Sequence, residues 1–263
     1  MLRSMYSGIS GLKNFQTKLD VIGNNISNVN TFGFKKSRVV FKDMISQTVA
    51  GATGSTDTNG GVNPKQVGLG SQMAAIDTMH TEGNSQYTGR LLDLKIAGDG
   101  YFVVGSGTNV NYTKAGNFYL DSVGDLVNSD GLHVQSTAGG IIKIPAGSKD
   151  MAIGKDGKVT YIPAAGGAPV TAGQIELVTF ANTGGLMKAG NNLFKETTNS
   201  GTAQKRASGA ALGDIESSML EMSNVDLSEE FTEMIVAQRG FQANTRIITT
   251  SDEILQELVN LKR

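Results

Sequence analysis

Apolar residues recur every seven positions in two segments of the chain, one near its start and one near its end. Such a repeat is typical of a helix that buries one seam against another helix. The N-terminal seam consists of Met5, Leu12, Phe15, Leu19, Ile22, Ile26 and Val29. The C-terminal seam consists of Leu227, Phe231, Met234, Phe241, Ile248, Leu255 and Leu258. Neither helix can cover its own seam, so the pattern predicts that the first helix packs against the last in a coiled coil.

The two predicted helices cover about residues 4–29 and 226–261. Asp226 followed by Glu229 has the spacing of a capping box, with Asp226 as the N-cap of the second helix. Each glycine inside a helix costs about 1 kcal/mol relative to alanine, so the first helix is expected to need packing partners. Its glycines are Gly8, Gly11 and Gly23.

The stretch between the helices has the short alternating patterns of β-strands. Apolar and polar residues alternate over residues 92–97, and Asp130-Gly131 and Asp156-Gly157 separate apolar stretches as hairpin turns do. The predicted fold class is therefore α+β. Its N- and C-terminal helices form a coiled-coil core, and a central all-β domain resembles a barrel or a sandwich.

Composition and charge narrow the functional classes. The chain has 263 residues, a formal net charge of −1 and no cysteine, which removes disulfides and thiolate metal sites. A nucleic-acid binder would show a basic excess or a basic stripe, and neither is present. No apolar run reaches the roughly 18 residues that span a bilayer. Residues 1–29 lack the apolar core of a secretory signal, so we expect a retained helix without a cleaved signal peptide.

Candidate catalytic and ligand-binding motifs are weak. Residues 98–100 read Gly-Asp-Gly, but no predicted helix follows to hold a phosphate, so a hairpin turn is favoured. The aspartates at 121, 125 and 130 lack the spacing of a calcium loop. His80 and His133 are single histidines. We therefore predict a protein that is not an enzyme and has no cofactor or metal.

Five segments resemble the signature regions of bacterial flagellar axial proteins, the rod and hook subunits. The most specific is LDVIGNNISNVNTFGFK at residues 19–35, and its signature positions are Asn24, Asn25, Asn28, Asn30, Gly33 and Phe34. The others are IAGDGYFVV at 96–104, YTKAGNF at 112–118, MSNVDL at 222–227 and AQRGFQAN at 237–244. The resemblance spans nearly the whole chain.

Within this family the choice lies between a hook protein and a distal rod protein. Residues 223–227 and 234–239 are similar to hook subunits, whereas the chain length suits distal rod proteins. Residues 48–66 lie where distal rod proteins carry an insertion, but their Gly/Thr/Ser-rich composition differs from it. The resemblance thus favours a short hook protein of a Gram-positive bacterium, with a distal rod subunit as the alternative.

The resemblance implies a hollow, curved helical tube that transmits torque. Residues 1–30 and 225–263 would line its channel, residues 31–70 would form an extended glycine-rich arm, and residues 71–224 would form the outer β-domain. Implied partners are many copies of the chain itself, the rod, hook-cap and hook–filament junction proteins, and the flagellar type III export apparatus. Neither nucleic acid nor membrane insertion is expected. The implied location is extracellular, in the flagellar hook.

Two other classes of function are open from the residues alone. One is a monomeric β-domain binding module whose terminal helices pair only with each other. The other is an enzyme with an unrecognised site, against which the lack of a nucleophile motif and of paired carboxylates argues. Tube formation by the purified chain separates a polymer subunit from a monomeric module.

Overall fold

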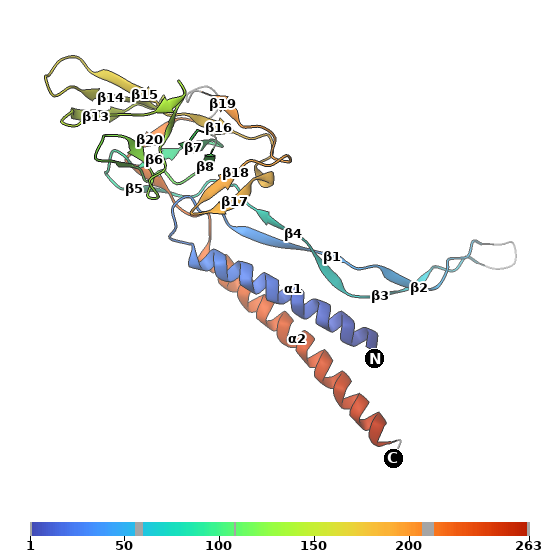
Figure 1. The fold of residues 1–263 in the computed structure, drawn as a ribbon. Helices are drawn as coiled ribbons and strands as arrows, with labels where there is room; N and C mark the ends of the chain where they lie inside the picture. Colours follow the sequence, from blue (N-terminus) through green and yellow to red (C-terminus); the bar gives the residue numbers. More distant parts are fainter. Residues whose placement is uncertain (1, 56–59, 108, 207–212, 262–263) are drawn as a thin grey trace. The chain divides into compact units, whose positions relative to one another are not determined.

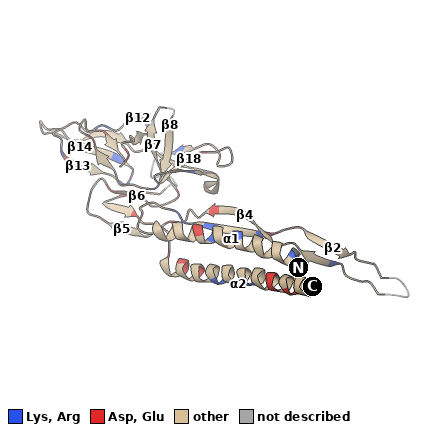
Figure 2. Cartoon of the chain, turned by 60° about the horizontal axis from the view of Figure 1, so that its bottom comes forward, with Lys and Arg blue, Asp and Glu red and all other residues tan. Residues whose placement is uncertain are grey.

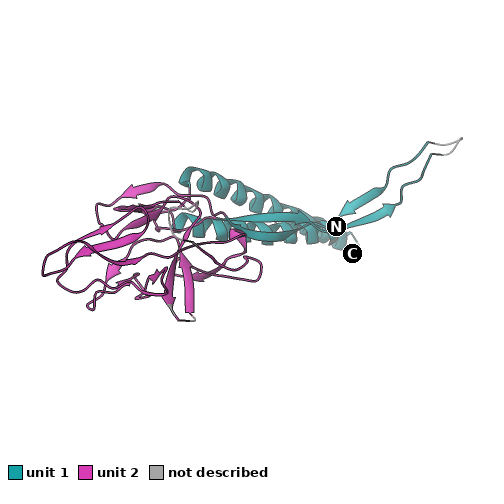
Figure 3. Cartoon of the chain, turned by 90° about the horizontal axis from the view of Figure 1, so that it is seen from above, with its two compact units in different colours: residues 1–27, 37–78, 226–263 teal, residues 28–36, 79–225 magenta. Residues whose placement is uncertain are grey.

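The computed structural model describes residues 2–55, 60–107, 109–206 and 213–261. The chain divides into two compact units, shown in teal and magenta in Figure 3. Unit 1 contains residues 1–27, 37–78 and 226–263, and unit 2 contains residues 28–36 and 79–225. A helix at each end and a β-rich region between them confirm the α+β fold class.

The elements of both units are labelled in Figure 1. Unit 1 holds α1 (Leu2–Ser27), β1 (Ser37–Asp43), β2 (Ser46–Ala50), β3 (Lys65–Gly68), β4 (Ser71–Thr78) and α2 (Leu227–Asn260). The first strands of unit 2 are β5 (Ser85–Tyr87), β6 (Leu94–Ile96), β7 (Tyr101–Ser106), β8 (Asn109–Thr113), β9 (Tyr119–Leu120), β10 (Leu126–Val127), β11 (Gln135–Ser136) and β12 (Gly140–Ile141). They are followed by β13 (Lys149–Ile153), β14 (Lys158–Ile162), β15 (Val170–Gln174), β16 (Leu177–Thr179), the 3-10 helix η1 (Thr183–Gly185), β17 (Met187–Gly190), β18 (Leu193–Lys195), β19 (Gln204–Arg206), β20 (Ile215–Ser217) and β21 (Met219–Glu221).

In unit 1, α1 and α2 lie side by side (Figure 1). Asp226 is the N-cap of α2, as predicted, and its carboxylate accepts hydrogen bonds from the backbone N–H groups of Ser228 and Glu229. The first helix ends at Ser27 rather than at Val29. Asn28 begins a turn there, because its carbonyl accepts the N–H of Thr31 at 3.1 Å and its side chain accepts the Thr31 hydroxyl.

Two antiparallel strand pairs complete unit 1. β1 pairs with β4, and both strands contact α1. β2 pairs with β3, and every residue of these two strands is exposed. The predicted glycine-rich arm, residues 31–70, therefore contains a paired ribbon that continues to a bridge between Thr53 and Val62.

Unit 2 is built on an antiparallel sheet with the order β17-β18-β8-β7-β16-β19. Its central strand β7 buries side chains on both faces, because successive residues of a strand point to opposite sides. Phe102 and Val104 join one hydrophobic core, while Tyr101 and Val103 join a second one. Within the described residues β17 and β19 are the edges of this sheet, so it is not a closed barrel.

The turns of unit 2 test the turn predictions. Asp156-Gly157 connects β13 to β14 in a hairpin, and Asp130-Gly131 lies in a turn where Gly131 has φ +78°. Both predictions are confirmed. Residues 98–100 connect β6 to β7, which pair with other strands, so the expected hairpin is instead a bend between two sheets.

Across the described part of the chain, no helix combines the length and apolar character that a membrane crossing requires.

Candidate subunit interface

The contact between α1 and α2 is formed by small residues on both helices. The ring of Phe15 lies over Gly240, where an added Cβ would come within 2.5 Å of the ring. A Cβ on Gly11 would lie 2.9 Å from the side-chain amide of Asn244, and one on Gly8 would lie 3.5 Å from Ile248. Three glycines that weaken the isolated helices therefore allow the two helices to approach closely. The same contacts show that the helices are antiparallel.

The face of α2 toward α1 has two columns of residues with a spacing of seven. One column contains the predicted seam residues Met234, Ile248 and Leu255, which are half-buried. The other column is small or polar, and it is on average more buried. Its members are Glu230, Ala237, Asn244 and Ser251. A search for apolar repeats misses this second column because only its spacing is regular.

The predicted N-terminal seam lies mostly within α1. Ile22 is buried, with 4% of its surface exposed. The half-buried members are Met5, Leu12, Phe15, Leu19 and Ile26. Val29 lies beyond the end of the helix in the turn over residues 28–30, which belongs to unit 2.

Several predicted seam residues of α2 contact solvent in the single chain. Leu227, Phe231, Phe241 and Leu258 are exposed by 39%, 50%, 36% and 48%. Other apolar residues of this helix are exposed as well. We call the following set the outer apolar residues of α2: Leu227, Phe231, Ile235, Ile247, Ile254 and Leu258. At 3.6 residues per turn they form two groups on different sides of the helix, residues 227–235 and 247–258. Grouped exposed apolar residues are typical of interaction surfaces.

Charged residues are distributed unevenly on α2. Its acidic residues lie toward its two ends, as Figure 2 shows in red, and residues 234–251 contain none. The central, acid-free part of α2 is the part that faces Gly8 and Gly11 of α1. Lys18 of α1 forms an ion pair with Glu233, but both side chains are partly exposed, so this pair contributes little to stability.

Asn25 joins three elements of unit 1. Its side-chain amide donates to the carbonyl of Ser37 at 2.8 Å and accepts the N–H of Ser37 at 3.0 Å, which ties α1 to the start of β1. The same amide donates to the carboxylate of Glu230 in α2 at 3.1 Å. Asn25 is 2% exposed and Glu230 6%. This signature residue therefore has a structural role that the sequence resemblance did not specify.

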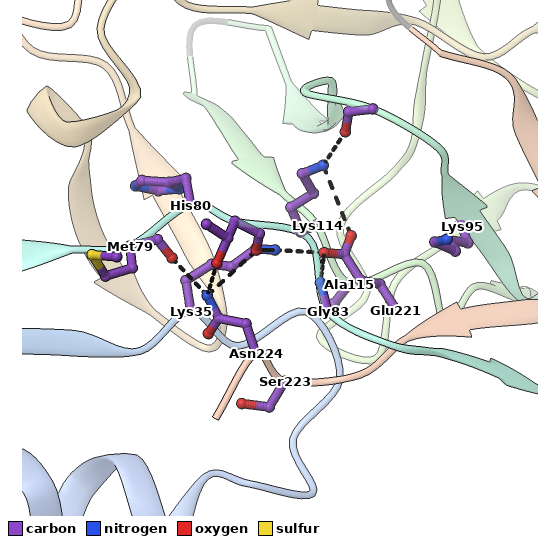
Figure 4. A network of polar contacts seen from close by, with 12 residues as sticks. Lys35, Met79, His80, Gly83, Lys95, Lys114, Ala115, Glu221, Ser223 and Asn224 are labelled. Carbon is purple, nitrogen blue, oxygen red and sulfur yellow. Dashed lines mark hydrogen bonds and ion pairs between the residues drawn. The ribbon is translucent and has the colours of Figure 1, made fainter. Parts of the chain in front are cut away.

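A buried ion pair lies at the end of the signature run, in unit 2 (Figure 4). The ammonium of Lys35 donates to the Oε1 atom of Glu221 at 2.5 Å and to the carbonyl of Thr81 at 2.7 Å, and both charged side chains are 0% exposed. The N–H of Gly83 donates to the same Oε1 atom at 3.1 Å. The segment after α1 is thus bound to the segment before α2.

Two further side chains extend this cluster (Figure 4). The ammonium of Lys114 lies 3.8 Å from Oε2 of Glu221 and donates to the carbonyl of Gly98 at 2.6 Å. Burial lowers the pKa of Lys114, and the nearby Glu221 carboxylate opposes that shift. Asn224 accepts the N–H of Lys36 at 2.8 Å and donates to the carbonyl of Met79 at 2.9 Å.

His80 borders the same cluster. Its Nδ1 atom lies 2.6 Å from the hydroxyl of Tyr101, and its ring contacts the ring of Phe194. Burial, together with the neighbouring Lys35, Lys188 and Lys114, lowers the pKa of His80 to about 4. His80 is therefore neutral at pH 7. The cluster is a set of buried cations balanced by one fully buried carboxylate.

The remaining signature residues lie in α1, in the turn after it and at the start of unit 2. Gly33 has φ +69°, and an added Cβ would lie 2.6 Å from the N atom of Ala115, so only glycine fits. Phe34 lies under the ammonium of Lys188 at 5.0 Å. Asn28 closes the turn after α1, Asn30 lines a cavity of about 220 Å³, and Asn24 is exposed on α1.

Sequence reasoning missed several residues of these contacts. Lys35 was quoted as part of the signature run, but its partner Glu221 has no local signal because 186 residues separate the two. Glu230, Asn244 and Ser251 carry no apolar signal, so their regular spacing alone did not mark them as buried. Within the described residues, no group of three or more metal-ligating side chains is close enough to hold an ion.

An α+β chain that pairs its terminal helices and leaves apolar residues exposed along one of them has the architecture expected of a structural, associating subunit. Comparison with known proteins identifies its family. Residues 5–35 match the flagella basal body rod protein model, residues 95–161 the flagellar hook protein FlgE/F/G D1 domain, and residues 216–261 the flagellar basal body rod FlgEFG protein C-terminal model.

Similarity to individual proteins extends over the full chain. It is 62% identical over 265 residues to the flagellar basal-body rod protein FlgG of Bacillus subtilis and 39% identical over 270 residues to FlgG of Borreliella burgdorferi, with 100% of each chain covered. It is 33% identical over 441 aligned positions to the flagellar hook protein FlgE of Borreliella burgdorferi, again with 100% of each chain covered. The chain belongs to the flagellar rod and hook protein family, as the signature runs indicated.

Proposed function

We propose that this chain is a subunit of the distal flagellar rod, which forms part of the basal body and connects to the hook. The observation that carries the proposal is the 62% identity to a flagellar basal-body rod protein, in an alignment of 265 positions that covers all 263 residues. Similar rod proteins of Borreliella burgdorferi and Caulobacter vibrioides align over 270 and 266 residues. The alternative stated from the sequence is thus preferred to the hook.

The hook prediction has less support. Its hook relative needs 441 aligned positions to cover a chain of 263 residues, so that protein carries long segments for which this chain has no counterpart. The similarity of residues 223–227 and 234–239 to hook subunits is compatible with both proteins, because the matching C-terminal model covers rod and hook members together. These residues therefore do not separate the two functions.

The proposed mechanism is mechanical. Many copies associate through contacts that do not close into a ring, and such contacts generate an open helical polymer. The outer apolar residues of α2 give each subunit a surface that further helices can cover. In the tube, residues 1–30 and 225–263 line the channel as a coiled-coil layer, residues 31–70 connect, and residues 71–224 face outward.

The partners follow from this placement. They are other copies of the chain, neighbouring rod subunits, the first hook subunits, and the flagellar export apparatus that delivers the chain. The hook-cap and hook–filament junction proteins belong to the hook reading and are not partners in this proposal. The location is the flagellar basal body, outside the cytoplasm.

Electron microscopy of basal bodies from cells that lack the gene tests the proposal. We expect particles that end before the hook and carry neither hook nor filament. A complementing chain with an affinity tag between Gly166 and Gly167, which are exposed between β14 and β15, should restore motility and place gold label on the rod. Complete rods without hooks, or label on the hook, would favour the hook subunit. Flagella of normal length in the deletion strain would favour a binding module.

A further inference from the structure

A charged residue is buried between α1 and α2 where an apolar one would fit the repeat. Glu230 occupies the heptad column that continues with Ala237 and Ser251, and it is 6% exposed. An ionised carboxylate is costly to bury unless it is hydrogen-bonded. Here the amide of Asn25 supplies that hydrogen bond at 3.1 Å. The contact is therefore position-specific.

The side chain of Asn25 is oriented by hydrogen bonds other than the one to Glu230. Two hydrogen bonds to the backbone of Ser37, at 2.8 and 3.0 Å, fix the orientation of its amide. One N–H of the amide remains to be directed at the carboxylate. This N–H group is satisfied only when the partner helix has an acceptor opposite Asn25, so α1 presents a donor in a fixed position to α2.

The apolar seam by itself discriminates weakly between registers. Its residues recur every seven positions, so a shift of seven residues places similar side chains opposite one another. The same shift brings Ala237 opposite Asn25 and leaves Glu230 without its donor. It also removes Gly240 from under the ring of Phe15, so the Asn25–Glu230 pair and the Phe15–Gly240 contact both favour the native register.

We propose that Asn25 and Glu230 are a specificity-determining pair of the helix contact. They select one register of α1 against α2 over registers shifted by seven residues. A single buried polar pair is known to specify helix register at a cost in stability. This selection of register within one chain does not rest on the proposed function.

Disulfide capture tests the proposal, because the natural chain has no cysteine. Gly8 and Ile248 face each other in the native register, so Gly8→Cys with Ile248→Cys reports that register. Gly8→Cys with Leu255→Cys reports a shift of seven residues. Each cysteine pair is introduced separately into the full chain. Each protein is then oxidised both in its assembled form and in its soluble form. Disulfides within one chain and between chains are separated on non-reducing gels.

Glu230→Leu removes the acceptor, whereas Glu230→Gln keeps an oxygen that accepts the Asn25 amide. With Glu230→Leu we expect the ratio of shifted to native disulfides to rise about tenfold or more, the discrimination that a hydrogen bond to a charged group supplies. Glu230→Gln should retain most of the native disulfide. Glu253→Leu, at an exposed position of α2, is the control and should leave the ratio unchanged.

An unchanged ratio in Glu230→Leu would overturn the proposal, as would an equal rise in Glu253→Leu. If Glu230→Leu does not assemble, the soluble chain still gives the within-chain comparison of native and shifted disulfides. If the chain that keeps Glu230 forms the native disulfide but never forms tubes, the proposed function fails and the register proposal stands.

Discussion

At the scale of single residues, His80 makes the stability of unit 2 depend on pH. The pKa of His80 is lowered from 6.5 to about 4 by burial and by the neighbouring lysines, so the unfolded chain takes up the proton first as pH falls. The stabilisation is complete above pH 6.5 and is lost between pH 6.5 and 4. The shift corresponds to about 3 kcal/mol, and solvent screening of the partly exposed ring reduces this to about 1–2 kcal/mol.

The measurement is the free energy of unfolding in urea at several pH values between 7 and 4. His80→Gln is the matched variant, since glutamine still bonds to the Tyr101 hydroxyl but does not titrate. We expect a shallower pH dependence in this variant. Parallel curves for the two proteins would show that His80 is not the responsible group.

Substituting Glu221 should lower the free energy of unfolding more than substituting its ion-pair partner Lys35. Removing one member of a buried ion pair costs about 3–5 kcal/mol because the other charge stays buried. Glu221 also faces the ammonium of Lys114 at 3.8 Å, so Glu221→Leu leaves two buried cations where Lys35→Met leaves one anion with a remaining cation. Urea unfolding should therefore show a larger loss for Glu221→Leu. Equal losses would contradict this account of the cluster.

Residues of the helix contact show how far sequence reasoning extends at this scale. Ile22 and Met234 were placed in the contact by their apolar spacing, and the structure buries them fully or partly. Glu230 and Asn25 were not, because a buried polar pair depends on a partner 205 residues away. Spacing identifies a position as buried only when its side chain is apolar.

At the scale of elements, the glycines of the two helices are not equivalent. Gly240 lies under Phe15, where a Cβ would approach the ring to 2.5 Å, whereas a Cβ on Gly23 would meet nothing within 4 Å. Gly23→Ala should stabilise the chain by up to about 1 kcal/mol. Gly240→Ala should destabilise it by about 1–3 kcal/mol, because the helices must separate. Thermal unfolding followed by circular dichroism measures both, and a stabilising Gly240→Ala would contradict the close helix contact.

The ribbon of β2 and β3 contributes no buried residue to the fold of the single chain. All of its residues are exposed, and an isolated two-stranded ribbon is marginally stable in water. We predict that residues 50–67 govern the stiffness of the tube rather than its assembly. Replacing residues 51–63 by Asn-Gly should leave tubes able to grow and lower their bending stiffness, measured from their curvature in electron micrographs. Unchanged stiffness would indicate a passive loop.

The types and order of the elements were largely predictable, and their pairing was not. Asp226 and the heptads located α2, because caps and seams are local signals. The pairing of β6 with β20 and of β5 with β21 joins strands more than 100 residues apart. No local sequence pattern encodes such pairing, so the sequence could not predict the order of the strands. In place of the expected barrel or sandwich, the structure has an open six-stranded sheet and several smaller sheets.

At the scale of the whole molecule, the outer apolar residues of α2 should matter for association and not for the fold of the single chain. Leu258 is 48% exposed, so Leu258→Asp should leave the melting temperature nearly unchanged. In the tube the same carboxylate would be buried without a partner, at a cost of several kcal/mol in every subunit. We expect loss of sedimentable polymer. Asn260→Asp, two residues further on and turned away from Leu258, is the control and should assemble normally.

The proposed polymer is a rod-like tube with the terminal helices of every chain innermost. Cryo-electron microscopy of tubes grown from the purified chain shows which part of the chain lines the channel. We expect straight, hollow tubes in which α1 and α2 line the channel and the β-rich unit 2 forms the outer layer. Tubes with the helices on the outside, or a chain that stays monomeric at high concentration while unit 2 is folded, would contradict it.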